Sequence, residues 1–285
     1  MILSFHPCFA ADHQIILGSR GLNEEDTAHI QRAEVVILPQ TCPRKLYEMC
    51  KKFSALIFPN YDKRFQYEGK IGQSRLFKIC HYPHPETTPW TSVTRFRISL
   101  EKRQNPMPPF PYLIKTDHGH ETEGVYLIEN RESLNVALDR LEISERSGRG
   151  GFIVQELVAS EGNVLRAVIL DQRVISYWKR PLKPGQIITS AATGARIDGA
   201  WRADLRMKGE THARNFSSDT GTNLAAIDFV FPLREADPQP LFLEINYYFG
   251  RRGLGGSENY YRLLRDAIRD WLKRNGFNPN SVTLL

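Results

Sequence analysis

Short hydrophobic runs alternate with polar stretches of helix length through the first sixty residues. The runs are MILSF (1–5), AEVVILP (33–39) and ALIFPN (55–60), and a helical pattern, RKLYEMCKKF, separates the last two. Strands that are separated by helix-length connections pair in parallel. The pattern therefore predicts a small parallel α/β layer, followed by a helix over residues 70–81.

The pattern changes after residue 81, because prolines at 83, 85 and 89 cannot continue a helix. Beyond this point the spacing predicts mainly strands and hairpins, with one helix over residues 131–142. The predicted strands are YLIKT and GVYLIEN on either side of a polar loop, FIVQELV (152–158), both halves of LRAVILDQRVISYWKR (165–180), LAAIDFVF (224–231) and PLFLEINYY (240–248). A tight turn is expected at Asp171 and Gln172, and an amphipathic helix between Ser257 and Gly276.

This order of elements indicates a mixed α/β and α+β protein. We expect a small N-terminal parallel α/β domain over residues 1–85, and a larger part over 86–285 with mainly antiparallel sheets. The larger part divides into two α+β subdomains, at residues 86–157 and 158–285.

The composition is that of a globular protein, since 41% of the 285 residues are hydrophobic and 25% are charged. The formal charge is +6, but the basic residues are dispersed among 32 acidic ones. Dispersed charge favours a solvated basic face, or a site for a small polyphosphate, over a nucleic-acid surface. We therefore expect no nucleic-acid partner.

No apolar run approaches the roughly 20 residues needed to span a bilayer, and the N-terminal segment lacks the basic region of a signal peptide. We therefore expect a cytoplasmic protein without membrane association. Cys8, Cys42, Cys50 and Cys80 show no CxxC spacing. The absence of that spacing argues against a zinc site, and we expect reduced, mostly packed thiols.

Polar residues interrupt one face of the last two predicted strands. Glu244 and Asn246 are two residues apart, so they project from the same face. If Phe231 pairs with Leu241 in an antiparallel ladder, Asp228 lies opposite Glu244. Facing carboxylates repel each other unless a cation lies between them, and two carboxylates with an amide oxygen suit magnesium. The alternative is that both carboxylates form ion pairs with nearby arginines.

Five separated segments occur in an order that resembles the ATP-grasp superfamily. This group of carboxylate-amine ligases includes D-alanine:D-alanine ligase, glutathione synthetase and the ribosomal-protein glutamate ligases. The segments are Lys70 with its helix and Pro85-Glu86-Thr87, YLIKTDHGHETEGV, FIVQELV, GNVLRAVILDQRVISYWKR, and the pair AAIDFVF and LFLEIN. The resemblance implies an ATP-grasp fold after the N-terminal domain. The phosphate-loop pattern GxxxxGK[ST] and the dinucleotide pattern GxGxxG are absent.

The resemblance also implies ATP and Mg²⁺ (or Mn²⁺) as cofactors, and it implies roles for particular residues. The implied nucleotide-binding residues are Lys70, Lys115, Gly119, Gly124, Glu156, Leu157, Val158 and Glu161. The implied metal ligands are Asp228, Glu244 and Asn246. Val164 stands at a position that is acidic in the family pattern, so Glu161 or Asn163 is the candidate for the ribose contact.

Basic residues complete the implied catalytic set. Arg166 begins one strand of the hairpin at 165–180, and either Lys179 or Arg180 joins it at the phosphates; a two-residue turn selects Lys179. Arg251 and Arg252 follow the last strand, and one of them is the candidate for a substrate carboxylate or the transferring phosphate. A surface role for both arginines is the alternative.

The expected function is an ATP- and Mg²⁺-dependent ligase that forms an amide or peptide bond through an acyl phosphate. The expected partners are small-molecule or peptide carboxylates and amines, and the oligomeric state, including a homo-oligomer, is left open. The alternative is an ATP-binding protein of the same fold that has no ligase activity and acts as a sensor or a partner-binding module. The segment Tyr247-Tyr248-Phe249-Gly250 departs from the family pattern, so the substrate pair cannot be carried over.

Overall fold

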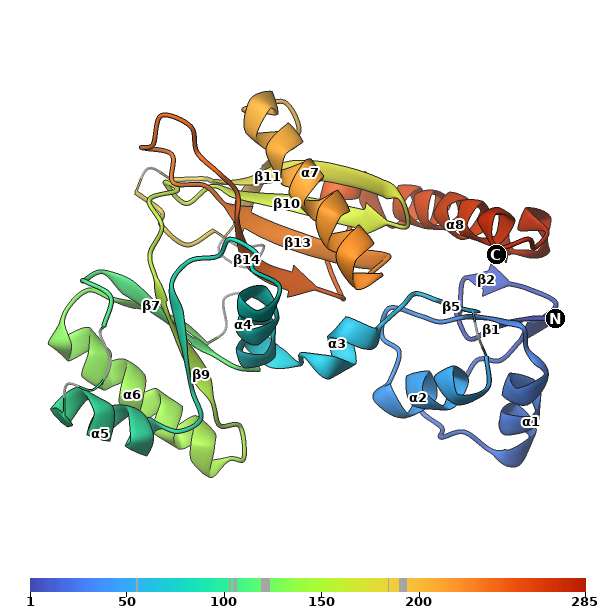
Figure 1. Cartoon of the computed structure of the whole chain (residues 1–285), viewed down its shortest axis with the longest axis horizontal. Helices are drawn as coiled ribbons and strands as arrows, with labels where there is room; N and C mark the ends of the chain where they lie inside the picture. The colour runs from blue at the N-terminus through green and yellow to red at the C-terminus, as the bar shows by residue number, and fades with distance from the viewer. Residues whose placement is uncertain (55, 103, 105–106, 119–123, 184, 190–193) are drawn as a thin grey trace.

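The computed structural model describes residues 1–54, 56–102, 104, 107–118, 124–183, 185–189 and 194–285 (Figure 1). In this described part, the strands form a four-stranded parallel sheet, two large antiparallel sheets of four and five strands, and a two-stranded ribbon. The arrangement confirms the expected mixture of a small parallel α/β layer with antiparallel α+β sheets. The large antiparallel sheets occupy the left and the top of the molecule, and the parallel sheet lies at the lower right.

The parallel sheet has the strand order β3-β1-β4-β5. Its strands are β1 (Ile2–Ser4), β3 (His13–Gln14), β4 (Val35–Ile37) and β5 (Leu56–Phe58), and its connecting helices are α1 (Glu24–Arg32) and α2 (Arg44–Phe53). Because side chains alternate along a strand, Val36 packs with α1 and α2, whereas Val35 and Ile37 face the opposite side. That side is covered by α8 (Gly256–Arg274).

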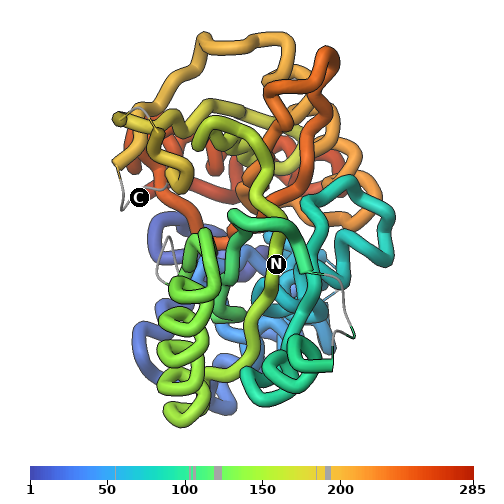
Figure 2. Tube along the Cα trace, turned by 90° about the vertical axis from the view of Figure 1, so that its left-hand side faces the viewer, coloured from blue at the N-terminus to red at the C-terminus, as the bar shows by residue number. Residues whose placement is uncertain are grey.

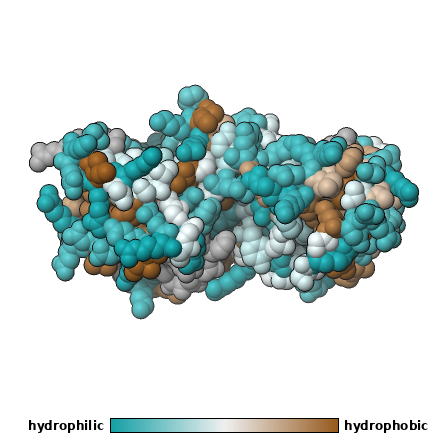
Figure 3. Space-filling view, turned by 90° about the horizontal axis from the view of Figure 1, so that it is seen from below, coloured by the Kyte–Doolittle hydropathy of each residue, from teal (hydrophilic) through white to brown (hydrophobic). Residues whose placement is uncertain are grey.

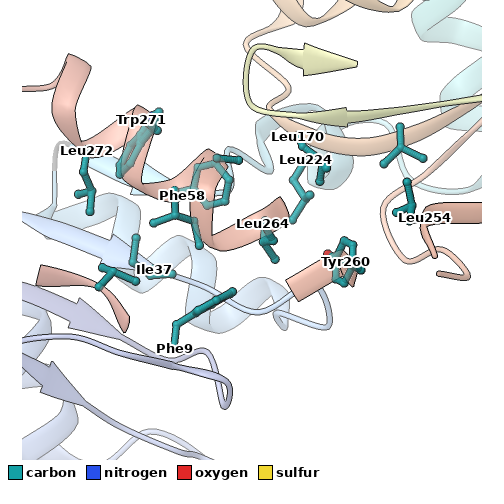
Figure 4. Packing of buried hydrophobic residues seen from close by; sticks show 14 of the residues in the cluster. Phe9, Ile37, Phe58, Leu170, Leu224, Leu254, Tyr260, Leu264, Trp271 and Leu272 are labelled. Atoms are coloured by element: carbon teal, nitrogen blue, oxygen red, sulfur yellow. The ribbon is translucent and has the colours of Figure 1, made fainter. Parts of the chain in front are cut away.

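Helix α8 joins the N-terminal sheet to the rest of the chain. Figure 4 shows Phe9, Ile37 and Phe58 packed against α8 residues, with the Phe58 and Trp271 ring centroids 5.5 Å apart. The final strand, β15 (Thr283–Leu284), pairs with β2 (Phe9–Ala10). The first and last segments of the sequence therefore lie side by side, as Figure 1 also shows.

The first large antiparallel sheet has the order β6-β9-β7-β8. Its strands are β6 (Thr87–Trp90), β7 (Tyr112–Thr116), β8 (Val125–Ile128) and β9 (Phe152–Glu156). Helices α5 (Val93–Lys102) and α6 (Arg131–Arg146) pack on the face that carries Tyr112, Ile114, Phe152 and Val154. The alternate residues Leu113, Lys115 and Gln155 therefore face away from these helices.

The second large sheet has the order β12-β11-β10-β13-β14. Its strands are β10 (Val164–Leu170), β11 (Arg173–Pro181), β12 (Ala195–Asp198), β13 (Leu224–Val230) and β14 (Leu241–Asn246). Helix α7 (Ala203–Thr220) covers the face of Leu165 and Ile227. On the other face, α8 covers Val168 and Ala226, and the half of that face that bears Arg166 and Asp228 lies beyond this packing.

Two strand registers decide where the polar side chains point. The hairpin at 165–180 has its two-residue turn at Asp171 and Gln172, as expected, because Leu170 pairs with Arg173. The expected pairing of Phe231 with Leu241 is wrong: Leu241 pairs with Val230, and a β-bulge between Asp228 and Phe229 shifts the register. The bulge absorbs one residue of β14, so Asp228 still lies opposite Glu244.

The remaining elements connect these layers. Helix α4 (Gly69–Ile79), predicted over residues 70–81, follows the short α3 (Asp62–Gln66), and the 3₁₀ turns η1 (Arg252–Leu254) and η2 (Pro279–Ser281) flank α8. Among the described residues, no helix combines the length and apolar character that crossing a bilayer requires. The four cysteines are free thiols; Cys42 and Cys50 are buried, whereas Cys80 is exposed.

Figure 2 shows the first antiparallel sheet and its helices (green) below the C-terminal sheet (yellow to red). On the face shown in Figure 3, hydrophobic residues are scattered among hydrophilic ones. Scattered apolar residues are normal for a protein surface.

Candidate active site

A cavity of about 750 Å³ lies between the two large antiparallel sheets. On the first sheet, Lys115 and Gln155 line the cavity from the face opposite α5 and α6, and on the second sheet Arg166 and Asp228 line it beyond the packing of α8. The predicted residues that line the cavity are Lys115, Glu156, Leu157, Val158, Arg166, Lys179, Asp228, Glu244, Asn246, Arg251 and Arg252. Segments that are separated by more than 100 residues in the sequence thus meet in one pocket.

Lys115 is the buried cation of the first sheet. Its side chain is 6% exposed, and its Nζ donates to Gln155 Oε1 at 2.7 Å. Gln155 Nε2 in turn donates to Thr87 Oγ1 at 2.9 Å, and that hydroxyl donates to the Pro85 carbonyl at 2.7 Å. This chain of hydrogen bonds fixes the ammonium at the cavity wall.

Burial lowers the pKa of Lys115 to about 8. Glu244 and Asp228 oppose this shift, whereas the positive charges of Lys70 and Lys179 add to it. A charge removed from water is costly unless an opposite charge compensates it. An anion that enters the cavity would therefore stabilise the charged form of Lys115.

Asp228 is the most heavily paired carboxylate of the second sheet. Arg166 donates to it through Nε and Nη2, both at 2.8 Å, and Lys179 Nζ donates to Oδ2 at 2.7 Å. Burial alone would raise the pKa of Asp228, but the two cations hold the pKa well below its usual range. The carboxylate is therefore ionised at neutral pH, and ion pairing with an arginine, the alternative considered from the sequence, holds for Asp228.

Glu244 is less heavily engaged. Its Oε1 accepts from Asn246 Nδ2 at 3.0 Å, and among the described residues no lysine or arginine lies within ion-pair distance of it. The described residues contain no group of three or more His, Cys, Asp or Glu side chains placed to hold a metal ion. Two carboxylates and an amide nevertheless fit a magnesium ion whose remaining ligands come from phosphate and water.

The hairpin register selects between the two basic residues at its end. Lys179 pairs with Val164 and projects from the same face as Arg166, so both reach Asp228. Arg180 projects from the opposite face, where it pairs with Asp198 at 3.0 Å and stacks over Trp201. The structure therefore brings Lys179, and not Arg180, into the cavity.

Arg251 and Arg252 form the basic end of the cavity. The Arg251 guanidinium carbon lies 4.8 Å from the Tyr260 ring centroid and 4.5 Å from that of Tyr261, and Nη1 donates to Ser257 Oγ at 3.4 Å. Stacking of this kind orients a guanidinium and leaves its edge for an anion. Arg252 lines the same end and is exposed.

Other predicted residues lie elsewhere. Lys70 is in the first turn of α4, close enough to Lys115 to lower its pKa, but it does not line the cavity. Gly124 has φ +76°, and an added Cβ would overlap the Thr116 side chain. Its role in the structure is thus a close approach of β7 and β8. Glu161 is exposed and does not line the cavity, and Gly119 lies outside the described residues.

Several cavity residues were not predicted. Ile187 and Ile188 supply apolar surface, Tyr248 also lines the cavity, and Gln155 anchors Lys115. Gln155 lies opposite Leu113 in the sheet and shares the face that lines the cavity, but it alternates with the predicted Glu156, so strand periodicity did not select it. Ile187 and Ile188 had no sequence signal, since they lie in a loop between β11 and β12.

Sequence comparisons find distant relatives. No protein-family model matches this chain. A protein named "Probable alpha-L-glutamate ligase 2" from Shewanella frigidimarina is 25% identical over 166 residues, 58% of this chain and 51% of the relative. The DNA polymerase II large subunit of Methanopyrus kandleri is 24% identical over 181 residues, 63% of this chain and 14% of that protein. The chain thus spans about half of one relative and a small part of the other.

Solved structures resemble this chain more completely. A RimK domain ATP-grasp protein from Sphaerobacter thermophilus has a TM-score of 0.59 and 11% identity, covering 93% of this chain and 98% of that one. D-alanine–D-alanine ligase from Bacillus anthracis has a TM-score of 0.58 and 12% identity, covering 92% and 89%. Carboxyaminoimidazole ribonucleotide synthase from Aspergillus clavatus, complexed with ATP, has a TM-score of 0.56 and 13% identity, covering 80% and 58%. At these identities the likeness establishes the fold.

Proposed function

We propose, from the ATP-grasp fold of this chain and the chemistry of its cavity, that it is an ATP- and Mg²⁺-dependent carboxylate-amine ligase. One observation carries the proposal: three buried or half-buried cations, Lys115, Arg166 and Lys179, meet the carboxylates of Asp228 and Glu244 between two facing sheets. An excess of fixed positive charge beside two carboxylates suits a polyphosphate that carries a divalent cation.

The cations would neutralise charge on the phosphates. Lys115 would bind phosphate oxygens from the first sheet, and Arg166 and Lys179 would do so from the second. Phosphoryl transfer needs little covalent chemistry from the protein, so positioning and charge stabilisation supply most of the catalysis. Lys70 would strengthen the local positive potential from the start of α4.

The same cavity would hold the adenine base. Glu156 would accept a hydrogen bond from the adenine amino group, and the backbone of Leu157 and Val158 would contact the ring edge, as the ATP-grasp resemblance implies. Ile187 and Ile188 line the same cavity, and their apolar side chains would pack against a flat aromatic ring.

Asp228, Glu244 and Asn246 would hold Mg²⁺. When bound, the ion neutralises phosphate charge and orients the transferring group. Glu244 is the ligand with free coordination capacity, whereas Asp228 is already oriented by Arg166 and Lys179. The pairing of Asp228 with two cations would set the geometry into which the ion fits.

The reaction would proceed in two steps. A substrate carboxylate attacks the γ-phosphorus of ATP, so an acyl phosphate forms and ADP leaves. An amine then attacks the acyl carbon, the C–O bond to phosphate breaks, and phosphate leaves with the bonding electron pair and takes up the proton that the amine loses as the amide forms. Arg251 would hold an anionic group of the substrate, because its guanidinium is fixed by Tyr260 and Tyr261 beside the cavity.

The test is a screen for phosphate release with ATP and Mg²⁺ over paired carboxylates and amines. L-glutamate is the first amine to include, because the relative from Shewanella is named a glutamate ligase. We expect Glu244→Ala to lower turnover by about 100-fold or more, as loss of a charge-stabilising group does. Glu235→Ala, an exposed glutamate in the loop between β13 and β14, is the matched control and should retain full activity.

The screen also separates the two candidate functions. An ATP-binding protein without ligase activity would show a higher melting temperature with ATP but no phosphate release with any pair. Full turnover in Glu244→Ala would overturn the metal assignment. Absence of any nucleotide effect on the melting temperature would overturn the proposal as a whole.

A further inference from the structure

Helix α4 lies in the middle of the molecule, between the two large sheets that enclose the cavity (Figure 1). Its first turn contacts the chain just after β7, which carries Lys115. Its second turn contacts β14, which carries Glu244 and Asn246. The helix therefore spans from the sheet with the buried lysine to the sheet with the metal-binding candidates.

The tie to the first sheet is made by Asp117, two residues after Lys115. Its Oδ1 accepts from Ile71 N at 2.7 Å, and its carbonyl accepts from Lys70 N at 3.2 Å. A carboxylate at a helix N-terminus satisfies free N–H groups and complements the helix dipole. The approach is so close that a Cβ on Gly69 would overlap the Asp117 carboxylate. This end of α4 is therefore fixed to β7.

On the second sheet, Leu76 and Phe77 of α4 pack in the hydrophobic core, and Gln73 makes the hydrogen-bonded tie. Its Nε2 donates to the Ile245 carbonyl at 2.9 Å, and its Oε1 accepts from Ile245 N at 2.8 Å. Strand β14 is at the edge of its sheet, so its outward backbone groups have no neighbouring strand. The primary amide of Gln73 takes the place of that strand for one residue.

The hydrogen bonds from Gln73 reach β14 at the segment that carries the metal-binding candidates. Ile245 lies between Glu244 and Asn246, and the β-bulge that interrupts the ladder with β13 lies immediately before Glu244. A bulge loosens the pairing that would otherwise fix the strand. The two hydrogen bonds from Gln73 restrain the backbone of Ile245. They therefore also restrain the directions of the neighbouring Glu244 and Asn246 side chains.

We propose that Gln73 is a positioning residue of the metal site, which acts by holding the β14 backbone so that Glu244 and Asn246 stay aligned with Asp228. The inference rests on the proposed function, because the ion that it concerns is the Mg²⁺ of that site. Gln73 itself touches neither the nucleotide nor the ion. Its loss should therefore weaken metal binding and leave metal-free nucleotide binding intact.

The test uses the full chain with Gln73→Met, which keeps the length of the side chain and removes both hydrogen bonds. Calorimetry measures the Kd of ADP in EDTA, and then the Mg²⁺ concentration that half-saturates the protein at fixed ADP. We expect the half-saturating Mg²⁺ concentration to rise about tenfold, in the range of second-shell losses at metal sites. The Kd of ADP in EDTA should stay within about twofold.

Two further variants make the result specific. Gln73→Asn keeps the amide but shortens the side chain, so we expect a smaller rise than in Gln73→Met, and it serves if the methionine variant does not fold. Gln31→Met places the same substitution at an exposed glutamine of α1 and should leave both measurements unchanged.

The outcomes are distinguishable. If the wild type binds no ADP, the proposed function fails. If the wild type shows Mg²⁺-dependent binding but Gln73→Met does not change the Mg²⁺ titration, the positioning role is wrong and the proposed function stands. An equal loss of metal-free and Mg²⁺-dependent binding also overturns the positioning role, because it indicates general destabilisation.

Discussion

At the scale of a single residue, Lys115 would make the proposed nucleotide binding pH-dependent. Its pKa, lowered to about 8 by burial, means that the ammonium is present below pH 8 and is lost above it. A bound polyphosphate favours the ammonium and raises this pKa, so binding above pH 8 takes up a proton. We expect the affinity for ADP to be highest below pH 8 and to fall by up to about tenfold per pH unit above it.

Titration calorimetry at pH 7.5, 8.5 and 9.5 measures this slope. Lys115→Met should bind ADP more weakly at all three values and should lose the slope, because no ammonium remains to titrate. Lys78→Met, at an exposed lysine of α4, should keep the slope of the wild type. The same steep slope in Lys115→Met would contradict the role of this lysine.

Many residues that the sequence proposes for the site line one cavity, because strand periodicity decides which side chains share a face. The shared face of Asp228, Glu244 and Asn246 follows from the alternation of side chains along a strand and from the antiparallel pairing of two consecutive strands. The pairing that led to them was wrong by one residue, and the bulge at Asp228 compensated. Bulges have no reliable sequence signal, and contacts such as that of Gln73 with Ile245 join residues 172 positions apart.

At the scale of elements, the turn η1 approaches the hairpin closely because Gly253 has no side chain. A Cβ on Gly253 would overlap the ring of Tyr177, which is buried and lies opposite Arg166. The ring lies in the core between β11 and α8, so it cannot yield without strain. We expect Gly253→Ala to lower the free energy of unfolding by about 1–3 kcal/mol, the usual cost of overpacking.

Urea denaturation measures this change, and Gly250→Ala is the control in the same segment. No atom lies within 4 Å of the added Cβ at Gly250, so its stability should be unchanged or higher by up to about 1 kcal/mol. Equal stability of the two variants would show that the Tyr177 contact does not constrain η1.

Helix prediction succeeded where the apolar stripe was strong and failed where it was not. The buried positions Leu264, Ala267, Ile268 and Trp271 give α8 a continuous stripe, and this helix was predicted within one or two residues of its ends. Helix α7 buries Leu205, Gly209, Ala213, Phe216 and Thr220. Small and polar residues make up most of that stripe, because α7 packs closely on the sheet at Gly209, and the periodic signal is lost.

At the scale of the whole molecule, α8 binds the N-terminal sheet and the C-terminal sheet into one hydrophobic core. This core contains Ile37 and Phe58 from the parallel sheet, Val168 and Leu224 from the antiparallel one, and the buried face of α8. The division at residue 85 stays a prediction from sequence. The shared core could not be predicted from the sequence, because a helix pattern indicates a buried face but not which sheet covers it.

The shared core predicts that the two ends of the chain unfold together. Leu264 on α8 is 1% exposed and packs in the core that both sheets share. Leu264→Ala should lower the free energy of unfolding by about 2–5 kcal/mol, and it should shift a single thermal transition to lower temperature. Arg262→Ala, whose ion pair with Glu258 is exposed on the same helix, should change stability by less than about 0.5 kcal/mol. Calorimetry that resolves two transitions, with only one moved by Leu264→Ala, would instead show that the N-terminal sheet unfolds independently of α8.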